Sequence, residues 1–188
     1  MEQNVLDVSD RYAFRAWLKA NHGVEKECWV CVKRGRPVDD SLFYYLDAVE
    51  EALCFGWIDS KNKMIGERRM QRFSPRKANS PWTELNKERV RRLERLGIMT
   101  DAGRRALPAV DETSFTVDKD IETAMKAAGV WMSFKSFHPL YQRVRAYNVA
   151  FYKHRNRAMY EQALSHLINE TKAGRMFGEW NDYGRLLE

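Results

Sequence analysis

The chain has 188 residues, of which 44% are hydrophobic and 31% charged, a balance that suits one globular domain, alone or with a helical extension. No apolar run approaches the roughly 20 residues that a membrane helix needs, so membrane insertion is not expected. The net charge is +6, and residues 61–105 hold 14 Lys or Arg against 5 Asp or Glu. This local excess predicts a basic face and an anionic partner.

Residues 1–15 lack the basic start and apolar stretch of a secretory signal, and the three cysteines fit a reducing compartment. We therefore expect a cytoplasmic protein. Cys28 and Cys31 form a C-x-x-C pair, but residues 28–33 are typical of a strand, where positions three apart point to opposite faces. Core thiols are favoured over a metal or redox site, and neither a metal nor a cofactor is expected.

The first elements along the chain are a helix, a strand and a second helix. The first helix is predicted from Ser9 to Gly23. Its expected apolar stripe consists of Tyr12, Ala13, Ala16, Trp17 and Ala20. After the strand at 28–33, the second helix is clearest over residues 47–55 and ends at Gly56.

A hairpin and a long helix follow. Residues 57–61 are predicted as a strand, 61–63 as a turn and 67–73 as the returning strand. Ser80 and Pro81, a capping hydroxyl and a proline at the first helical position, predict a helix that runs to about residue 96. Its expected apolar stripe is Trp82, Leu85, Val90, Leu93 and Leu96. Its expected solvent face is Lys87, Glu88, Arg91, Arg92 and Arg95.

The C-terminal third is predicted to be helical. A short helix at 100–107 precedes a polar linker at 111–120. Further helices are expected at 121–128, from His138 onward and at 159–173. The aromatic tail, residues 177–185, either docks on a helix seam with Trp180, which is favoured, or closes over a site.

These elements predict an α+β fold, a small antiparallel sheet with packed helices and a helical C-terminal third, because strands come first without regular alternation with helices. Residues 1–110 are expected to form the α+β core. Residues 111–188 are expected to form a helical part packed on that core. The sequence does not predict an oligomeric state.

Candidate ligand-binding residues gather between positions 57 and 86. Arg76 and Lys77 precede the predicted helix start at Ser80, where N–H groups and the helix dipole attract anions. An anion pocket is expected there, with Trp57 or Trp82 as its wall. The full set of candidate residues is Trp57, Asp59, Arg69, Arg72, Arg76, Lys77, Ser80, Trp82 and Asn86.

Three alternatives stay open for this region. Asp59 can pair internally with one of the arginines at 69, 72 and 76, in which case the motif is structural. Basic residues with interleaved aromatic rings also resemble a nucleic-acid surface, although no named nucleic-acid motif is present. An enzyme that uses Asp59 with nearby arginines is the third alternative, without a recognised nucleophile or dinucleotide fingerprint.

Several motifs occur together in order. They are Ala-Leu-Cys-Phe-Gly-Trp-Ile-Asp-Ser at 52–60, Arg-Phe-Ser-Pro-Arg-Lys at 72–77, Ser-Pro-Trp at 80–82, Asn86 and Gly-Ile-Met-Thr-Asp-Ala-Gly at 97–103. Over residues 10–107 the chain thereby resembles the YdeI/OmpD-associated family, although its C-terminal third departs from the tail of many members. The resemblance implies a small bacterial-type protein linked to bacteriocin protection, and it supplies no catalytic residues.

The expected function is therefore a binding or stress-protection protein that takes an anionic small molecule or a phosphate-bearing ligand at a helix N-terminus. Nucleic-acid binding and an unidentified enzymatic reaction are the alternatives.

Overall fold

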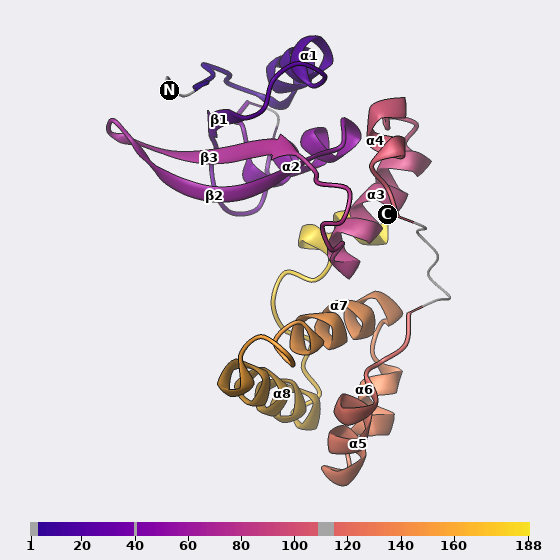
Figure 1. Ribbon diagram of the computed structural model, residues 1–188. Coiled ribbons are helices and arrows are strands. Elements are labelled where there is room, and N and C mark those ends of the chain that lie inside the picture. Colours follow the sequence, from indigo (N-terminus) through magenta and orange to yellow (C-terminus); the bar gives the residue numbers. More distant parts are fainter. Residues whose placement is uncertain (1–3, 40, 109–114) are drawn as a thin grey trace. The chain divides into compact units, whose positions relative to one another are not determined.

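The computed structural model describes residues 4–39, 41–108 and 115–188. The chain forms two compact units, the first from residues 1–81 and 89–109 and the second from residues 82–88 and 110–188. A three-stranded antiparallel sheet in the first unit and helices in both confirm the α+β prediction (Figure 1). Within the described ranges, no helix is long and apolar enough to cross a bilayer.

The sheet consists of β1 (Cys28–Cys31), β2 (Trp57–Ile65) and β3 (Arg68–Pro75), in the order β1-β3-β2. Of the residues in β3, those at 70–73 pair with β1, so the end of the β2–β3 hairpin extends beyond β1 (Figure 1). The predicted turn at 61–63 is wrong, because strand pairing continues to Ile65 opposite Arg68. Gly66 makes the turn, with a φ of +60° that a glycine adopts without a steric penalty.

Helices α1 (Arg11–Asn21) and α2 (Tyr45–Cys54) pack against each other in the first unit. Helix α1 buries Phe14 and Leu18, whereas Tyr12 is 62% exposed, so the predicted apolar stripe was wrong. The buried side of α1 also carries two arginines that bind carboxylates of α2. Periodicity of apolar residues alone therefore assigned the wrong face.

Helix α3 (Glu84–Arg95) begins later than its predicted start at Ser80, and that prediction was wrong. The Thr83 hydroxyl accepts a hydrogen bond from the Asn86 N–H at 3.1 Å, so Thr83 takes the capping position. The Ser80 hydroxyl instead donates to the Lys77 carbonyl at 2.7 Å. Ser80 and Pro81 thus belong to the loop before the helix.

The two halves of α3 belong to different units. Val90 and Leu93 are buried, as the apolar stripe predicts, but Leu96 is more than half exposed. Leu85 packs against the core of the second unit. Glu88, which was expected on a solvent face, is buried, and that expectation was wrong. The short helix α4 (Asp101–Arg105) follows, within the predicted range.

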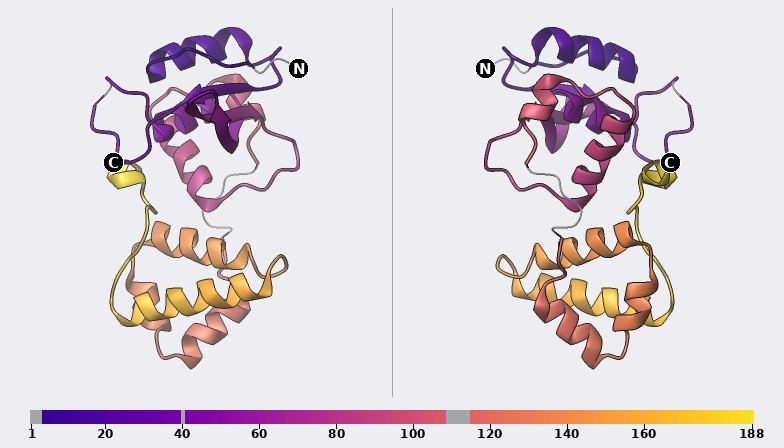
Figure 2. Two further views of the ribbon diagram at one scale, coloured as in Figure 1. Left: turned by 90° about the vertical axis from the view of Figure 1, so that its left-hand side faces the viewer. Right: turned by 90° about the vertical axis from the view of Figure 1, so that its right-hand side faces the viewer.

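The second unit is helical. Its elements are α5 (Lys119–Ala127), α6 (Trp131–Ser136), α7 (Pro139–Ala150), α8 (Arg157–Lys172) and the 3-10 turn η1 (Asp182–Leu187). Helices α7 and α8 lie side by side (Figures 1 and 2). Helix α6 was not predicted, because six residues do not establish a periodicity. The predicted linker at 111–120 lies outside the described residues over 111–114, and α5 already includes its last two positions.

The tail packs on α7, as the docking alternative expects. The Tyr141 ring makes edge contacts with Phe177 and Trp180 at 6.1 and 5.6 Å, and Trp180 is 8% exposed. The Arg145 Nη2 donates to the Phe177 carbonyl at 2.5 Å. These contacts make the tail part of the core of the second unit.

Candidate functional site

Asp59 lies half-buried on β2 and accepts a hydrogen bond from the Tyr45 hydroxyl at 2.7 Å. An arginine at position 69, 72 or 76 was one expected partner of Asp59, whereas its partner in the structure is the phenol of Tyr45. Burial and the neighbouring Asp59 carboxylate raise the pKa of Tyr45 to about 12. Tyr45 is therefore a neutral donor at physiological pH, which is unlike an acid–base pair tuned for catalysis near pH 7.

Two further polar side chains surround this pair. The Arg34 guanidinium lies 3.8 Å from the centre of the Tyr45 ring, and its Nη2 donates to the Gln71 Oε1 at 2.6 Å. The Gln71 amide in turn donates to the Lys61 carbonyl at 3.3 Å. The sequence did not indicate this cluster, because Arg34 follows β1 in an irregular segment with no periodicity. Its side chains satisfy one another, which favours a structural role for Asp59.

Arg72 forms an ion pair on the sheet. Its Nε and Nη2 each lie 2.7 Å from the Glu27 Oε2, and its Nη1 donates to the Ser60 hydroxyl at 3.1 Å. Hydrogen bonds from the Trp29 indole and from Arg72 lower the pKa of Glu27 below its usual range. Arg72 is therefore held by a carboxylate of this unit.

The loop that follows β3 contains Arg76 and Lys77, the two cations expected to form the anion pocket. The Arg76 Nη2 donates to the Pro81 carbonyl at 2.9 Å, and Lys77 is exposed. The expected pocket also required a helix N-terminus at Ser80, and the helix begins only at Glu84. That residue is 2% exposed, so a carboxylate already occupies the first turn of α3, where the dipole favours negative charge.

The candidate tryptophans and Asn86 are divided between the two units. Trp57 is 1% exposed, and its indole donates to the His22 carbonyl at 3.1 Å. The Trp17 ring meets Trp57 edge-on at 5.7 Å. Trp57 is thus a core residue of the first unit, whereas Trp82 and Asn86 belong to the second unit. Arg69 lies on the exposed hairpin end.

Sequence reasoning missed a buried charge network between α1, α2 and α3. Its carboxylates are Asp47, Glu50 and Glu51, which are 2%, 0% and 3% exposed. Arg11 reaches all three, with N–O distances of 3.3, 3.5 and 2.6 Å in that order. Arg15 and Arg92 add pairs at 2.7 and 3.0 Å. Acids spaced three and four residues apart in an apolar helix were the available signal.

The end of the β2–β3 hairpin, residues 61–69, is called the ribbon. Its cations are Lys61, Lys63, Arg68 and Arg69, and its acid is Glu67. Lys61, Arg68 and Arg69 are exposed, and the Lys63 amine lies 4.6 Å from the Trp29 ring centre. Arg68 contacts the Asp7 carboxylate at a long 3.9 Å, and both of these side chains are exposed to solvent. The ribbon therefore presents a net positive charge.

Two of the three cysteines, Cys28 and Cys54, lie in environments that suppress thiolate formation. All three are free thiols, and Cys28 and Cys54 are buried. Burial raises the pKa of Cys28, and it raises the pKa of Cys54 to about 11. Among the described residues, no group of three or more His, Cys, Asp or Glu is placed to hold a metal ion.

Comparison with known proteins relates part of the chain to a family. The model of a family described as a domain of unknown function (DUF8412) matches residues 6–106, which is more than half of the chain. No curated protein and no solved structure matches. The resemblance to the YdeI/OmpD-associated family stays a prediction.

Proposed function

This chain belongs to the DUF8412 family, whose function is unknown, and we propose that its first unit binds phosphate-bearing polyanions, nucleic acids above all, through the ribbon. The single observation that carries the proposal is the ribbon itself, a basic two-stranded hairpin end that extends beyond β1 (Figure 1). Polyanion binding thus replaces the small-anion pocket as the leading hypothesis.

The geometry of the ribbon supports this proposal. Side chains alternate along β3, so Arg68 and Arg72 share one face while Arg69 lies on the other. Both faces of the ribbon therefore carry cations. A two-stranded ribbon is narrow enough to enter the major groove of DNA. Lys and Arg side chains neutralise phosphates, and the affinity that results falls as the salt concentration increases.

The other expected roles receive less support from the contacts. Asp59 is bonded to a neutral phenol, and the first turn of α3 contains the buried Glu84. Both features reduce the case for catalysis at Asp59 and for a phosphate at the helix start. A nucleic-acid role agrees with the cytoplasmic location expected from the sequence, and a stress-protection role stays a prediction.

The test removes exposed charge from the ribbon. We expect Lys61→Gln, Arg68→Gln and Arg69→Gln, combined in one variant, to weaken binding to mixed-sequence duplex and single-stranded oligonucleotides in fluorescence anisotropy. For each phosphate that the variant no longer neutralises, the slope of log affinity against log salt should become shallower by about 1.

A second triple variant, with Lys19→Gln, Lys119→Gln and Lys172→Gln, is the matched control because it removes the same charge from exposed positions elsewhere. Its affinity should fall much less. Equal losses of affinity in the two variants would mean that binding depends only on net charge, which contradicts a role for the ribbon. Absence of wild-type binding at low salt would refute the proposal. Competition with inorganic phosphate distinguishes polyanion binding at the ribbon from a small-anion site near Arg76 and Lys77. Free phosphate would saturate the small-anion site but not the ribbon.

A further inference from the structure

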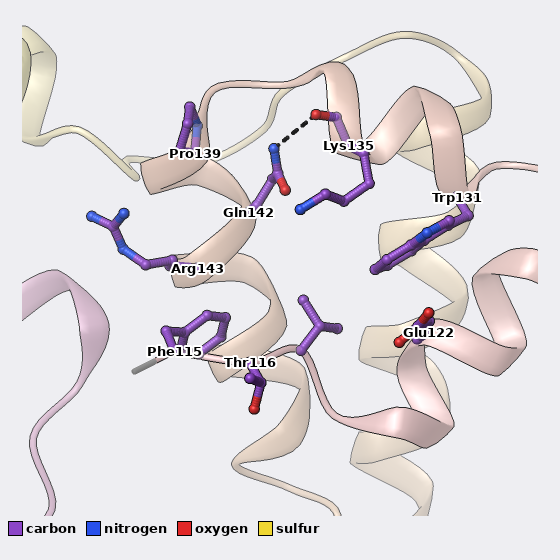
Figure 3. Close-up of a pocket in the computed structure, with 9 residues that line it drawn as sticks. Phe115, Thr116, Glu122, Trp131, Lys135, Pro139, Gln142 and Arg143 are labelled. Atoms are coloured by element: carbon purple, nitrogen blue, oxygen red, sulfur yellow. Dashed lines mark hydrogen bonds between the residues drawn. The ribbon is translucent and has the colours of Figure 1, made fainter. Parts of the chain in front are cut away.

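A cavity of about 410 Å³ lies within the second unit, outside the part of the chain that matches the family. Its walls come from the segment before α5 and from helices α5, α6 and α7 (Figure 3). Phe115, Val117, Trp131 and Pro139 supply apolar surface. A volume in this range, with apolar walls and a few polar groups, is typical of small-molecule sites.

The amide of Gln142 is fixed in one orientation. Its Nε2 donates to the carbonyls of Lys135 and Phe137 at 3.0 and 2.7 Å, so both amide hydrogens are used. Gln142 is 7% exposed, and among the described residues no donor reaches its Oε1. Figure 3 shows this oxygen facing the cavity. This oxygen is not among the buried side-chain atoms without a partner, so it is accessible at the cavity surface and can accept a hydrogen bond from water or from a ligand.

A cation lies beside that acceptor. The Lys135 side chain crosses the cavity between Trp131 and Gln142, with its amine directed toward the Gln142 amide (Figure 3). The amine lies 5.8 Å from the Trp131 ring centre, and no carboxylate of the described residues is within ion-pair distance of it.

The other charges that line the cavity are already paired. The Glu122 carboxylate lies 2.6 Å from the Lys126 amine. Arg143 contacts the buried carboxylate of Glu88 at 2.8 Å, and its guanidinium points away from the cavity centre (Figure 3). Lys135 therefore sets the net charge that a ligand would meet.

We infer that this cavity binds a small planar organic acid that carries an O–H or N–H donor. The carboxylate of such a ligand forms an ion pair with the Lys135 amine, its O–H or N–H donates to the Gln142 Oε1, and its ring packs against Trp131. This site does not depend on the proposed function of the ribbon, because its residues all belong to the other unit.

The probe for the experiment is para-hydroxybenzoate, which has one ring, one carboxylate and one hydroxyl donor. A ligand of about ten non-hydrogen atoms supports a dissociation constant on the order of 1 mM or below, so protein-observed NMR is the suitable method. The indole N–H signal of Trp131, assigned with Trp131→Phe, should shift and saturate. Benzoate, which lacks the donor, and para-hydroxybenzamide, which lacks the charge, should bind more weakly.

Lys135→Gln is expected to weaken para-hydroxybenzoate binding about fivefold, the effect of one solvent-accessible ion pair, and to leave para-hydroxybenzamide binding unchanged. Lys119→Gln is the matched control, because Lys119 is an exposed cation of α5 in the same unit and does not line the cavity. An unsaturable shift, an unchanged affinity in Lys135→Gln, or an equal loss in Lys119→Gln would each overturn the inference. The ribbon variant should bind the probe like the wild type, which keeps the two proposals separable.

Discussion

Arg11 and Glu51 are joined by two hydrogen bonds, from Nε at 2.9 Å and from Nη2 at 2.6 Å to the same carboxylate oxygen. Glu51 is 3% exposed, so the pair links α1 to α2 inside the first unit. The ion pair compensates a large desolvation cost, and removing one partner leaves the other charge buried without compensation. The stability of this unit therefore depends on polar groups as well as on its apolar core.

Replacing Arg11 tests that dependence. Arg11→Met should lower the free energy of unfolding by about 3 kcal/mol, because Asp47, Glu50 and Glu51 would all lose a cation. Urea unfolding followed by circular dichroism gives the measurement. Lys19→Met, on the exposed side of the same helix, should change stability by less than about 0.5 kcal/mol. A destabilisation below about 1 kcal/mol in Arg11→Met would contradict the role of the network.

Tyr45 makes the free energy of unfolding depend on pH in the alkaline range. A tyrosine titrates near pH 10 in the unfolded chain, and the pKa of Tyr45 is about 12 in the folded protein. Because the folded pKa is raised, the contribution is fully present below pH 10 and is lost as pH rises through 12. Tyr45→Phe should remove roughly 2 kcal/mol of this pH-dependent change.

The matched control for Tyr45 is Tyr12→Phe, since Tyr12 is 62% exposed. Its stability between about pH 9 and 12 should follow that of the wild type. Unfolding curves at several pH values, together with tyrosinate absorbance, make the comparison. Parallel curves for Tyr45→Phe and the wild type would exclude a raised pKa at this position.

The start of α3 can be located by two alanine substitutions. Thr83→Ala should cost about 1 kcal/mol, because the hydroxyl accepts the Asn86 N–H at the first turn. Ser80→Ala removes only an exposed loop hydrogen bond and should cost less than about 0.5 kcal/mol. Thermal unfolding compares the two. The reverse order would restore the helix start predicted from the sequence.

The docked tail is tested at Gly178. A Cβ at this position would lie 2.5 Å from the Arg145 Nη2, and the backbone φ is +66°. Gly178→Ala should therefore be destabilised by about 1 kcal/mol, the usual cost of an alanine in this conformation, and should in addition displace the Arg145 bond to the tail.

Gly174 provides the control, since its φ is also +66° but nothing lies within 4 Å of its Cβ position. Gly174→Ala should show the backbone cost alone. The difference between the two unfolding free energies measures the contact with Arg145. Identical values would mean that the tail accommodates a side chain at no cost.

The sequence predicted the classes of element better than their details. Hydrophobic patterns located α2 and α8 to within a few residues, because a glycine follows each of them, and His138 with Pro139 located the start of α7. The hairpin turn was misplaced because Lys-Asn-Lys is a common turn sequence. Gly66, which tolerates a positive φ, competed for the same role and formed the turn.

The candidate site was harder to predict, because side-chain partners come from distant segments. Asp59 pairs with Tyr45 of α2, and Arg72 pairs with Glu27 just before β1, so neither is open to a ligand in the way its local motif indicated. The cavity beside Trp131 depends on an unpredicted short helix. Local sequence contains no information about which of several cations is paired and which, like Lys135, is not.

The division of α3 between the two units bears on how such a chain evolves. Residues 82–88 lie inside the family segment, yet they supply Glu84 and Glu88 to Arg143 of the helical part. A recombination event that joined residues 6–106 to a different C-terminal partner would leave these two buried carboxylates without their arginine. We therefore expect related chains that keep both acids together with a similar helical part to keep a basic residue at the position of Arg143.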